Sequence, residues 1–478
     1  MAQVIIGRKK EKQLLEDIYH SGASEFVVVH GRRRVGKTFL VRELFSDRMT
    51  FYHTGLSPAE RENEAKTILQ RQLEVFFASL VAYGYQGPMP SNWIEAFNRL
   101  RALLVQKGGE RQVVFLDELP WMDTARSGFM SAFEHFWNGW GAGQSNLMLI
   151  VCGSSTSWIN DHIINNHGGL YNRITSEIEL LPFTLKESEE FYNSRGMMID
   201  RYDMLQAYMI FGGIPYYMSL LRKGQSLAQN IDELCFSRRG QLSDEFDRLF
   251  NSLFVNPEDN KALIRLLFRR KSGMMRSEIA SATGGSNGRL TTLLKGLVAG
   301  NFISTYRNYG ASKRETYYKL TDAFCLFYLS FMDGGKTTDE HFWSNNLLTG
   351  SLNAWRGLAF ENLCFAHIAQ IKTALGIAGV HTETMPWKSK AKEDGAQIDM
   401  VIDRDDRVIN VCEMKFSTDD YVITRSYDRE LRHKLTLFAE ETKTRKSLHL
   451  TLVTTYGLKR NEYFGRVQRV VTMDDLFC

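Results

Sequence analysis

The first third of the chain alternates between two patterns of apolar residues. Residues 8–19 have the spacing of an amphipathic helix, and residues 37–45 predict another helix directly after an apolar run. Three continuous apolar runs predict buried strands: EFVVVH, VVFLDE at 113–118 and LMLIVCG at 147–153. GLSPAE and QGPMPS are typical of turns, with a helix expected between them at about 60–83. This alternation predicts an α/β domain with a parallel, buried sheet.

The pattern becomes helical after LLPFTLKE. Helices are expected up to about residue 255, interrupted by GGIPYYM at 212–218, and they predict a helical lid. Between 260 and 332, three helices precede two strand-like runs, FISTYR and ETYYKL, joined by the turn NYGASKR, which predicts a winged helix-turn-helix. The polar stretch GGKTTDEHFWSNN predicts a linker before a last α/β unit. We therefore expect domains at 1–195, 196–255, 256–335 and 340–478.

Composition narrows the class of protein. A chain of 478 residues is long enough for roughly three domains, and 44% hydrophobic with 24% charged residues is ordinary for a globular protein. Neither a signal peptide nor an apolar stretch of membrane-spanning length is present, which predicts a cytoplasmic protein without a membrane partner. Six scattered cysteines predict reduced thiols rather than disulfides or zinc. A net charge of +4 is too small to imply nucleic-acid binding, so any DNA contact must come from a local patch.

HGRRRVGKT, between the first strand and its helix, has the frame of a phosphate-binding loop. Gly31, Gly36, Lys37 and Thr38 satisfy G-x-x-x-x-G-K-[ST]. In such a loop the backbone N–H groups and the helix N-terminus hold phosphates, the lysine reaches the outer phosphates, and the hydroxyl binds Mg²⁺. The sequence therefore predicts ATP and Mg²⁺ as ligands, with Lys37 also in a catalytic role.

Polar residues that follow the next two strands predict the rest of the site. Asp117 is expected to hold Mg²⁺, and Glu118 to act as general base on the attacking water; the alternative is a surface turn after a core strand. Ser154 or Ser155 is expected to sense the outer phosphate or hold that water, or else to cap a helix. Arg173 is a candidate cation for the γ-phosphate, within one chain or across a homo-oligomer, unless it is an exposed structural arginine.

Together, IGRKKE, HGRRRVGKT, VVFLDE, CGSSTSW, YNRI, ELLPF and GGIPYYM resemble the bacterial and archaeal AAA-type ATPase family often called archaeal ATPases. In that family the C-terminal part is a domain of unknown function, DUF234. The resemblance covers nearly the whole chain and implies an AAA-type P-loop NTPase fold. It also implies that three residues near the N-terminus lie by the adenine base: Ile6, Gly7 and Arg8. The remaining predicted nucleotide contacts are Arg34, Val35 and Phe39.

The resemblance also implies that arginines inside this loop are common in the same family. Because backbone amides hold the phosphates, Arg32, Arg33 and Arg34 can project outward to a phosphate, an acidic partner surface or DNA. Solvated cations are the alternative.

The winged-helix segment contains a turn, TGGSNG, before RLTTLLKGLV, the expected recognition helix. Its cations could neutralise DNA phosphates: Arg276, Arg289, Lys295, Arg307, Lys313 and Arg314. The alternative is a protein–protein joint or lid.

The last domain contains a second set of carboxylates. Helix WRGLAFENLCFAHI contains Glu361, the strand AQIDMVID contains Asp399, and period 2 places Glu413 and Lys415 on one face of RVINVCEMKF. Carboxylates that hold Mg²⁺ beside a cation suit phosphodiester cleavage. The arrangement resembles the PD-(D/E)xK nuclease fold, an α/β restriction-endonuclease-like domain, with Ile398 where proline would stand. Further polar candidates are Gln397, His433 and Lys434.

Two alternatives are open for this domain. Its charged residues form ordinary salt bridges by chance, or it has a nuclease fold that does not cleave DNA. Two functions from different classes follow from the sequence. The first is an ATP-driven enzyme that acts on DNA through the winged helix and the nuclease-like domain. The second is a regulatory ATPase switch whose last domain is a catalytically inactive scaffold. A metabolite kinase is disfavoured, because the additional domains resemble DNA-acting modules.

Overall fold

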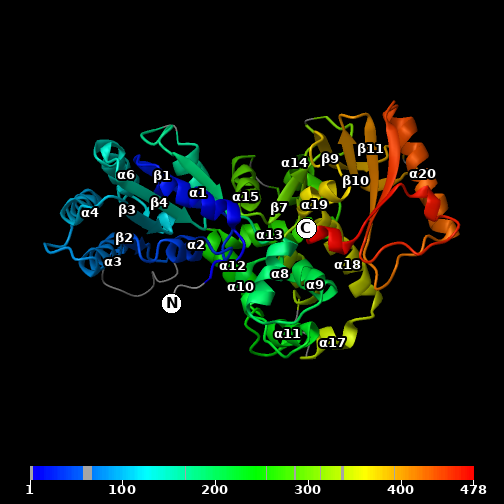
Figure 1. The fold of residues 1–478 in the computed structure, drawn as a ribbon, viewed down its shortest axis with the longest axis horizontal. Coiled ribbons are helices and arrows are strands. Elements are labelled where there is room, and N and C mark those ends of the chain that lie inside the picture. Colours follow the sequence, from blue (N-terminus) through cyan, green and yellow to red (C-terminus); the bar gives the residue numbers. More distant parts are fainter. Residues whose placement is uncertain are drawn as a thin grey trace. The chain divides into compact units, whose positions relative to one another are not determined.

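The computed structural model describes residues 4–478 apart from 58–66, 167, 255, 285–286, 313, 335–338 and 392. Figure 1 shows the ribbon, with its elements labelled along the chain. The chain forms two compact units. The first comprises 1–182, 248–257 and 295–300, and the second 183–247, 258–294 and 301–478. The four predicted domain limits stay predictions.

The first unit is built on a parallel five-stranded sheet in the order β2-β3-β4-β1-β5. Its strands are β1 Glu25–His30, β2 Met49–Thr54, β3 Gln112–Asp117, β4 Leu147–Gly153 and β5 Ser176–Glu179. The three strands expected from apolar runs are confirmed as β1, β3 and β4, and β3 and β4 are buried at every position. The sheet edges β2 and β5 were not predicted, because exposed and polar residues interrupt their apolar pattern.

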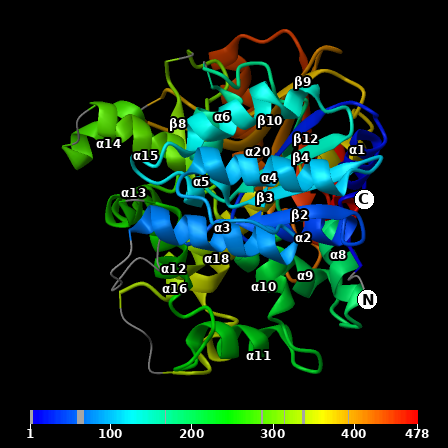
Figure 2. The same cartoon turned by 90° about the vertical axis from the view of Figure 1, so that its left-hand side faces the viewer.

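Several helices pack against this sheet. They are α1 Lys9–Tyr19, α2 Lys37–Leu44, α3 Ile68–Ala82, α4 Trp93–Lys107, α5 Leu119–Met122, α6 Phe129–Gly139, η2 Gly141–Gly143, α7 Thr156–Ile159 and η3 Asn160–Ile164. In Figure 2, α3 and α4 lie in front of the strands. Phe76 of α3 packs on Phe51 of the sheet, and Phe133 of α6 packs on Phe26. Phe97 of α4 contacts both Phe76 and Phe133 in the same hydrophobic core. The predicted helix at 60–83 is confirmed from Ile68; its expected first residues and part of the preceding turn lie outside the described residues.

The second unit begins with the expected helical region. Its elements are α8 Leu185–Ser194, α9 Arg201–Phe211, α10 Pro215–Ser219, α11 Leu227–Ile231, η4 Asp232–Phe236 and α12 Glu245–Leu253, the last of which continues into the first unit. GGIPYYM interrupts the helices as predicted. Gly213 has φ +67°, and a Cβ there would lie 2.3 Å from the carbonyl oxygen of Phe183. The close approach comes from the hydrogen bond that Phe183 N–H donates to Gly213 O at 2.8 Å.

Three helices and a hairpin follow, as the sequence predicts. They are α13 Pro257–Arg269, β6 Met274–Met275, α14 Arg276–Thr283, α15 Asn287–Ala299, β7 Ile303–Tyr306 and β8 Tyr317–Leu320. The hairpin is joined by β6 in a three-stranded antiparallel sheet of order β6-β8-β7. Lys313 and part of the turn TGGSNG lie outside the described residues.

The predicted linker is wrong over residues 342–346. After α16 Ala323–Phe331, these residues form helix α17 Phe342–Asn346. Trp343 is buried, and its backbone N–H donates to Asp232 Oδ1 at 2.7 Å. A buried aromatic residue thus fixes a segment that its polar composition marked as exposed.

The C-terminal part contains a mixed five-stranded sheet of order β13-β12-β11-β10-β9. Its elements are α18 Gly350–Ala366, α19 Ile368–Ala374, β9 Thr382–Lys388, β10 Gln397–Arg404, β11 Val408–Lys415, α20 Arg425–Thr442, β12 Ser447–Thr454, η5 Phe464–Arg466, β13 Arg469–Val471 and α21 Met473–Leu476. β9, β10 and β11 are antiparallel, whereas β11, β12 and β13 run parallel. The two strands and the helix expected for the carboxylates are confirmed as β10, β11 and α18. Among all described residues, no helix is both long and apolar enough to cross a membrane.

Candidate functional site

The predicted phosphate-binding loop joins β1 to α2. Gly31 has φ +134°, and a Cβ at this position would lie 2.4 Å from the carbonyl oxygen of Leu180. Leu180 donates its N–H to His30 O at 2.8 Å, so the chain after β5 presses directly on the start of the loop. Gly36, at the N-cap of α2, has φ +94° and open space where a side chain would project. The two glycines are therefore needed for different reasons: close backbone approach at Gly31, and backbone conformation at Gly36.

Lys37 folds back over the loop. Its ammonium donates to the carbonyl oxygens of Gly31 at 2.8 Å and Arg32 at 3.1 Å, and the residue is only 5% exposed. Helix α2 also begins at Lys37, so its first backbone N–H groups lie beside the loop. The N-terminus of a helix favours anions. A buried cation and the N-terminus of a helix meet here, as an anion site requires.

Thr38 and Asp117 are brought together from α2 and the end of β3. The Thr38 hydroxyl donates to Asp117 Oδ2 at 2.9 Å. Asp117 is buried, and it also accepts from the Tyr52 hydroxyl at 3.4 Å and from the Cys152 thiol at 2.6 Å. Burial raises the pKa of the Cys152 thiol well above its usual value, which keeps it a donor to the carboxylate. The hydroxyl and the carboxylate are oxygen donors of the type that Mg²⁺ prefers.

Glu118 points to the end of β4 rather than to Thr38. Its Oε2 accepts from both the backbone N–H and the hydroxyl of Ser154, each at 2.9 Å. Burial raises the pKa of Glu118, while Lys37 and the Ser154 hydrogen bonds act in the opposite direction. Ser154 thus holds the expected base in position. Ser155 is the N-cap of α7 but makes no side-chain capping bond, so the structure does not support the capping alternative for it.

The N-terminal residues reach the same loop. Gly7 and Arg8 both have positive φ, and Arg8 Nη2 donates to Val35 O at 3.3 Å. Ile6 precedes them and is partly buried.

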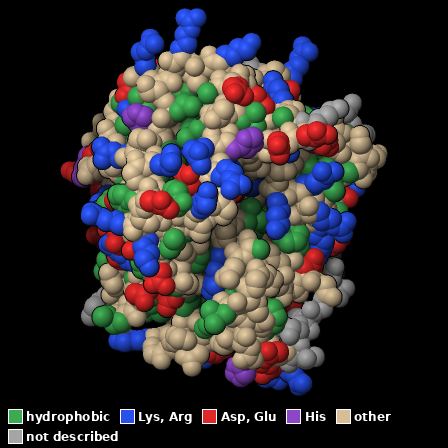
Figure 3. Space-filling view, turned by 90° about the vertical axis from the view of Figure 1, so that its right-hand side faces the viewer, with side chains coloured by type: hydrophobic (Ala, Val, Ile, Leu, Met, Phe, Trp, Pro, Cys, Tyr) green, Lys and Arg blue, Asp and Glu red, His purple; other side chains and the backbone are tan. Residues whose placement is uncertain are grey.

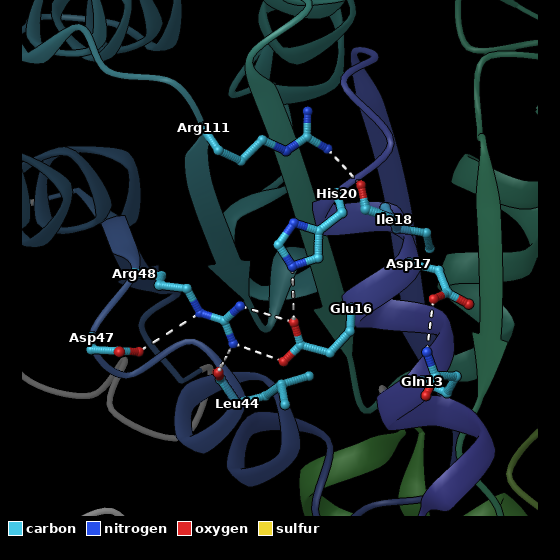
Figure 4. Close-up of polar contacts among 9 residues, drawn as sticks. All are labelled: Gln13, Glu16, Asp17, Ile18, His20, Leu44, Asp47, Arg48 and Arg111. Atoms are coloured by element: carbon cyan, nitrogen blue, oxygen red, sulfur yellow. Dashed lines mark hydrogen bonds and ion pairs between the residues drawn. The ribbon is translucent and has the colours of Figure 1, made fainter.

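Helix α1, which carries Arg8 at its N-cap, is fixed from the opposite end (Figure 4). Arg48 donates to both carboxylate oxygens of Glu16, at 2.9 and 2.8 Å, and Arg111 donates to Ile18 O at 2.8 Å. These bonds set the direction of α1 and so of the residues before it. Sequence reasoning missed both arginines, because their partners are distant in the chain.

The loop arginines differ from one another. Arg32 is only 4% exposed, so neither outward projection nor the solvated-cation alternative describes it. Arg33 and Arg34 are partly exposed, and Arg34 has φ +73°.

Two other predicted contacts lie at the surface. Phe39 is 38% exposed on α2, and Arg173 is exposed in the segment before β5. Within the described chain, the Arg173 side chain has no ion pair or hydrogen bond.

A second group of polar residues lies on β10, β11 and α20. Glu413 is buried, and its Oε2 accepts from Lys434 at 2.8 Å and from the Tyr427 hydroxyl at 3.2 Å, with Lys415 Nζ at 3.7 Å. Burial, together with nearby Asp399, raises the pKa of Glu413 to about 7. Its other oxygen, Oε1, is buried and has no hydrogen-bond partner in the described structure. Tyr427 and Lys434 are seven residues apart and therefore share one face of α20; sequence reasoning missed the tyrosine.

Glu361 does not complete this group. It pairs with Lys319 of β8, Oε1 to Nζ, at 2.7 Å, whereas Asp399 Oδ2 accepts from the backbone N–H of Met414 at 3.0 Å. His433 bonds to the carbonyl oxygen of Asp394 instead. In the described ranges, no three His, Cys, Asp or Glu side chains are grouped to hold a metal ion.

The predicted DNA-contacting cations are only partly available. Arg289 forms an ion pair with Asp259, and Arg276 donates to the Thr291 hydroxyl at 2.8 Å. The exposed ones are Lys295, Arg307 and Arg314.

Comparison with known proteins agrees with the site in the first unit. Residues 6–221 match the family described as an ATPase domain predominantly from Archaea. The matched residues include the phosphate-binding loop and the carboxylates Asp117 and Glu118, so this segment is similar to that family at the site itself.

Individual relatives are distant. An uncharacterized protein of Methanocaldococcus jannaschii is 22% identical over 369 residues, which cover 75% of this chain and 76% of that protein. A Walker-type ATPase of Pyrococcus abyssi is 19% identical with a TM-score of 0.47, covering 68% of this chain and 96% of its own. The ORC2 protein of Aeropyrum pernix is 13% identical with a TM-score of 0.42, covering 69% and 94%.

The contact between Gly31 and Leu180 predicts a large effect of one methyl group. Gly31→Ala should lower the free energy of unfolding of the first unit by at least about 2 kcal/mol, because the backbone conformation is strained and the Cβ meets a carbonyl oxygen. Gly143→Ala is the control, since no atom lies within 4 Å of its Cβ position. Urea unfolding followed by fluorescence measures both; equal midpoints for the two variants would contradict the close approach.

Proposed function

We propose that the protein is a Mg²⁺-dependent ATPase. The observation that carries this proposal is that the two carboxylates at the end of β3 have different partners. Asp117 accepts from the Thr38 hydroxyl at 2.9 Å, whereas Glu118 accepts from Ser154. One carboxylate is thus placed with the hydroxyl at the phosphate-binding loop, and the next is placed apart from it. This separation suits metal binding by the first and proton abstraction from water by the second.

Thr38 and Asp117 are the residues that would hold Mg²⁺, whose role when bound is to neutralise charge on the phosphates. The chain's own residues supply the remaining functions. Lys37 moves from the loop carbonyls to the outer phosphates, and the N-terminus of α2 stabilises their charge. Glu118 accepts a proton from water, with Ser154 holding the carboxylate. Arg173, exposed before β5, is proposed to reach the γ-phosphate from the same or a neighbouring chain.

We further propose that the nucleotide cycle controls a DNA-acting C-terminal region, in which the helices and hairpin of residues 257–320 serve as a winged helix. Support for a nuclease-like, DUF234-type role comes from Asp399, Glu413 and Lys415. The partnerless buried oxygen of Glu413 would suit a divalent cation held by these two carboxylates. Lys and Arg side chains also spread across the face of the molecule shown in Figure 3. Arg425 and Arg429 of α20 are exposed as well.

The regulatory switch is favoured by a different observation. Glu413 already has Lys434 at 2.8 Å, and Glu361 has Lys319 at 2.7 Å, so two expected metal ligands are neutralised within the chain. In this alternative the C-terminal part is a catalytically inactive scaffold, and ATP binding changes a partner-binding surface.

Lys37→Ala should abolish ATP binding at the phosphate-binding loop, because the variant lacks the buried ammonium that bonds to the loop carbonyl oxygens of Gly31 and Arg32. Fluorescence of a labelled ATP analogue measures binding, and Lys9→Ala is the matched control with an exposed lysine. An affinity for the ATP analogue that is the same in the Lys37 variant and the unaltered protein would place the ATP site elsewhere.

Glu118→Gln should leave ATP binding intact and lower turnover by at least about 100-fold, because the amide cannot accept the proton of the attacking water. Phosphate release measures turnover, with Glu110→Gln as an exposed control. Unchanged phosphate release in the Glu118 variant would remove this residue from the reaction.

Asp399→Asn and Lys415→Ala should each abolish metal-dependent nicking of a supercoiled plasmid while ATP binding stays unchanged. Lys443→Ala, which removes an exposed lysine of the same domain, should nick normally. If the unaltered protein does not nick with Mg²⁺ or Mn²⁺, the regulatory switch is the better account.

A further inference from the structure

A cavity of about 810 Å³ lies within the second unit, between the three-stranded sheet, α18 and the β9–β10 pair. Its volume falls in the range of about 300–1,000 Å³ that small-molecule sites occupy. It is separate from the phosphate-binding loop, and neither Asp399 nor Glu413 lines it. Glu361 lines this cavity, although it does not join the predicted metal site around Glu413.

Charge is distributed unevenly over this cavity. Five of its lining residues are Lys or Arg, and Glu361 is the acidic one. The ion pair of Glu361 with Lys319 neutralises one cation in the wall. Four cations remain, all exposed and without an acidic partner in the part of the chain that the structure describes: Arg269, Arg270, Lys271 and Lys388. A cluster of exposed, unneutralised cations attracts an anionic group, phosphate above all.

The wall of the cavity is aromatic and carries amides. Tyr306 and Tyr317 stack on each other with ring centroids 5.4 Å apart and an interplanar angle of 19°. The Nδ2 group of Asn362 is buried, and no described residue accepts a hydrogen bond from it. Aromatic rings beside an unsatisfied amide donor are suited to a heteroaromatic base, which offers both a π-face and hydrogen-bond acceptors.

We propose that this cavity binds a nucleotide. The base lies by Tyr306 and Tyr317 and accepts a hydrogen bond from Asn362, and the phosphate lies at Arg270 and Lys388. A free mononucleotide and a nucleotide within a single strand share this chemistry. Gln397, which lines the cavity, is two residues from Asp399 on β10. The proposal is independent of ATP hydrolysis and of DNA cleavage.

The test uses the full-length protein with Lys37→Ala, so that the phosphate-binding loop does not take up the probe. Thymidine monophosphate is titrated by calorimetry, and a fluorescent five-residue oligothymidylate by anisotropy. Arg270→Ala with Lys388→Ala removes two cations of the cavity. Arg239→Ala with Lys390→Ala is the matched control, because it removes two exposed cations of the same unit that do not line it.

The cavity pair should weaken binding by at least about tenfold, and the control pair by less than about threefold. Tyr317→Ala should weaken it by at least about fivefold through lost stacking. Uptake of the monophosphate identifies a free nucleotide as a ligand, and uptake of the oligonucleotide alone identifies a strand. The proposal is overturned if neither probe binds, or if the cavity pair weakens binding no more than the control pair. The cavity pair alters only exposed side chains, so this comparison stands even if the Tyr317 variant does not fold.

Discussion

The nucleotide site depends on how closely two backbone segments approach each other at Gly31. The carbonyl oxygen of Leu180 occupies the space that any side chain at Gly31 would need. This contact holds the loop against the segment after β5 and fixes the direction of the carbonyl groups that anchor Lys37. Loop position, lysine position and the N-terminus of α2 therefore follow from one steric constraint.

The order of the strands then determines what surrounds the loop. In a parallel sheet the carboxyl ends of the strands meet at one edge, where ligands bind. β4 lies between β1 and β3, so Asp117 at the end of β3 meets Thr38 after β1 and Cys152 of β4. The next residue, Glu118, has φ +49°, and it turns to Ser154. Two adjacent carboxylates thus acquire different surroundings through one backbone conformation.

Local features could be predicted from the sequence, whereas distant pairings could not. The apolar runs gave β1, β3 and β4 correctly, and glycine spacing identified the loop, because both signals lie within a few residues. Composition could not show that Trp343 would be buried and its segment helical. Nor could it show that Lys319, 42 residues before Glu361 in the chain, would pair with that carboxylate. The burial of Arg32 likewise depends on tertiary packing.

Calorimetry of the unaltered protein tests most directly whether main-chain dipoles and Lys37 hold a triphosphate. With Mg²⁺ present, ATP should bind at the phosphate-binding loop, and adenosine at least about 100-fold more weakly, because only the phosphates reach the loop amides and the buried ammonium. Equal affinity for adenosine and ATP, or no heat of binding from folded protein, would contradict the account.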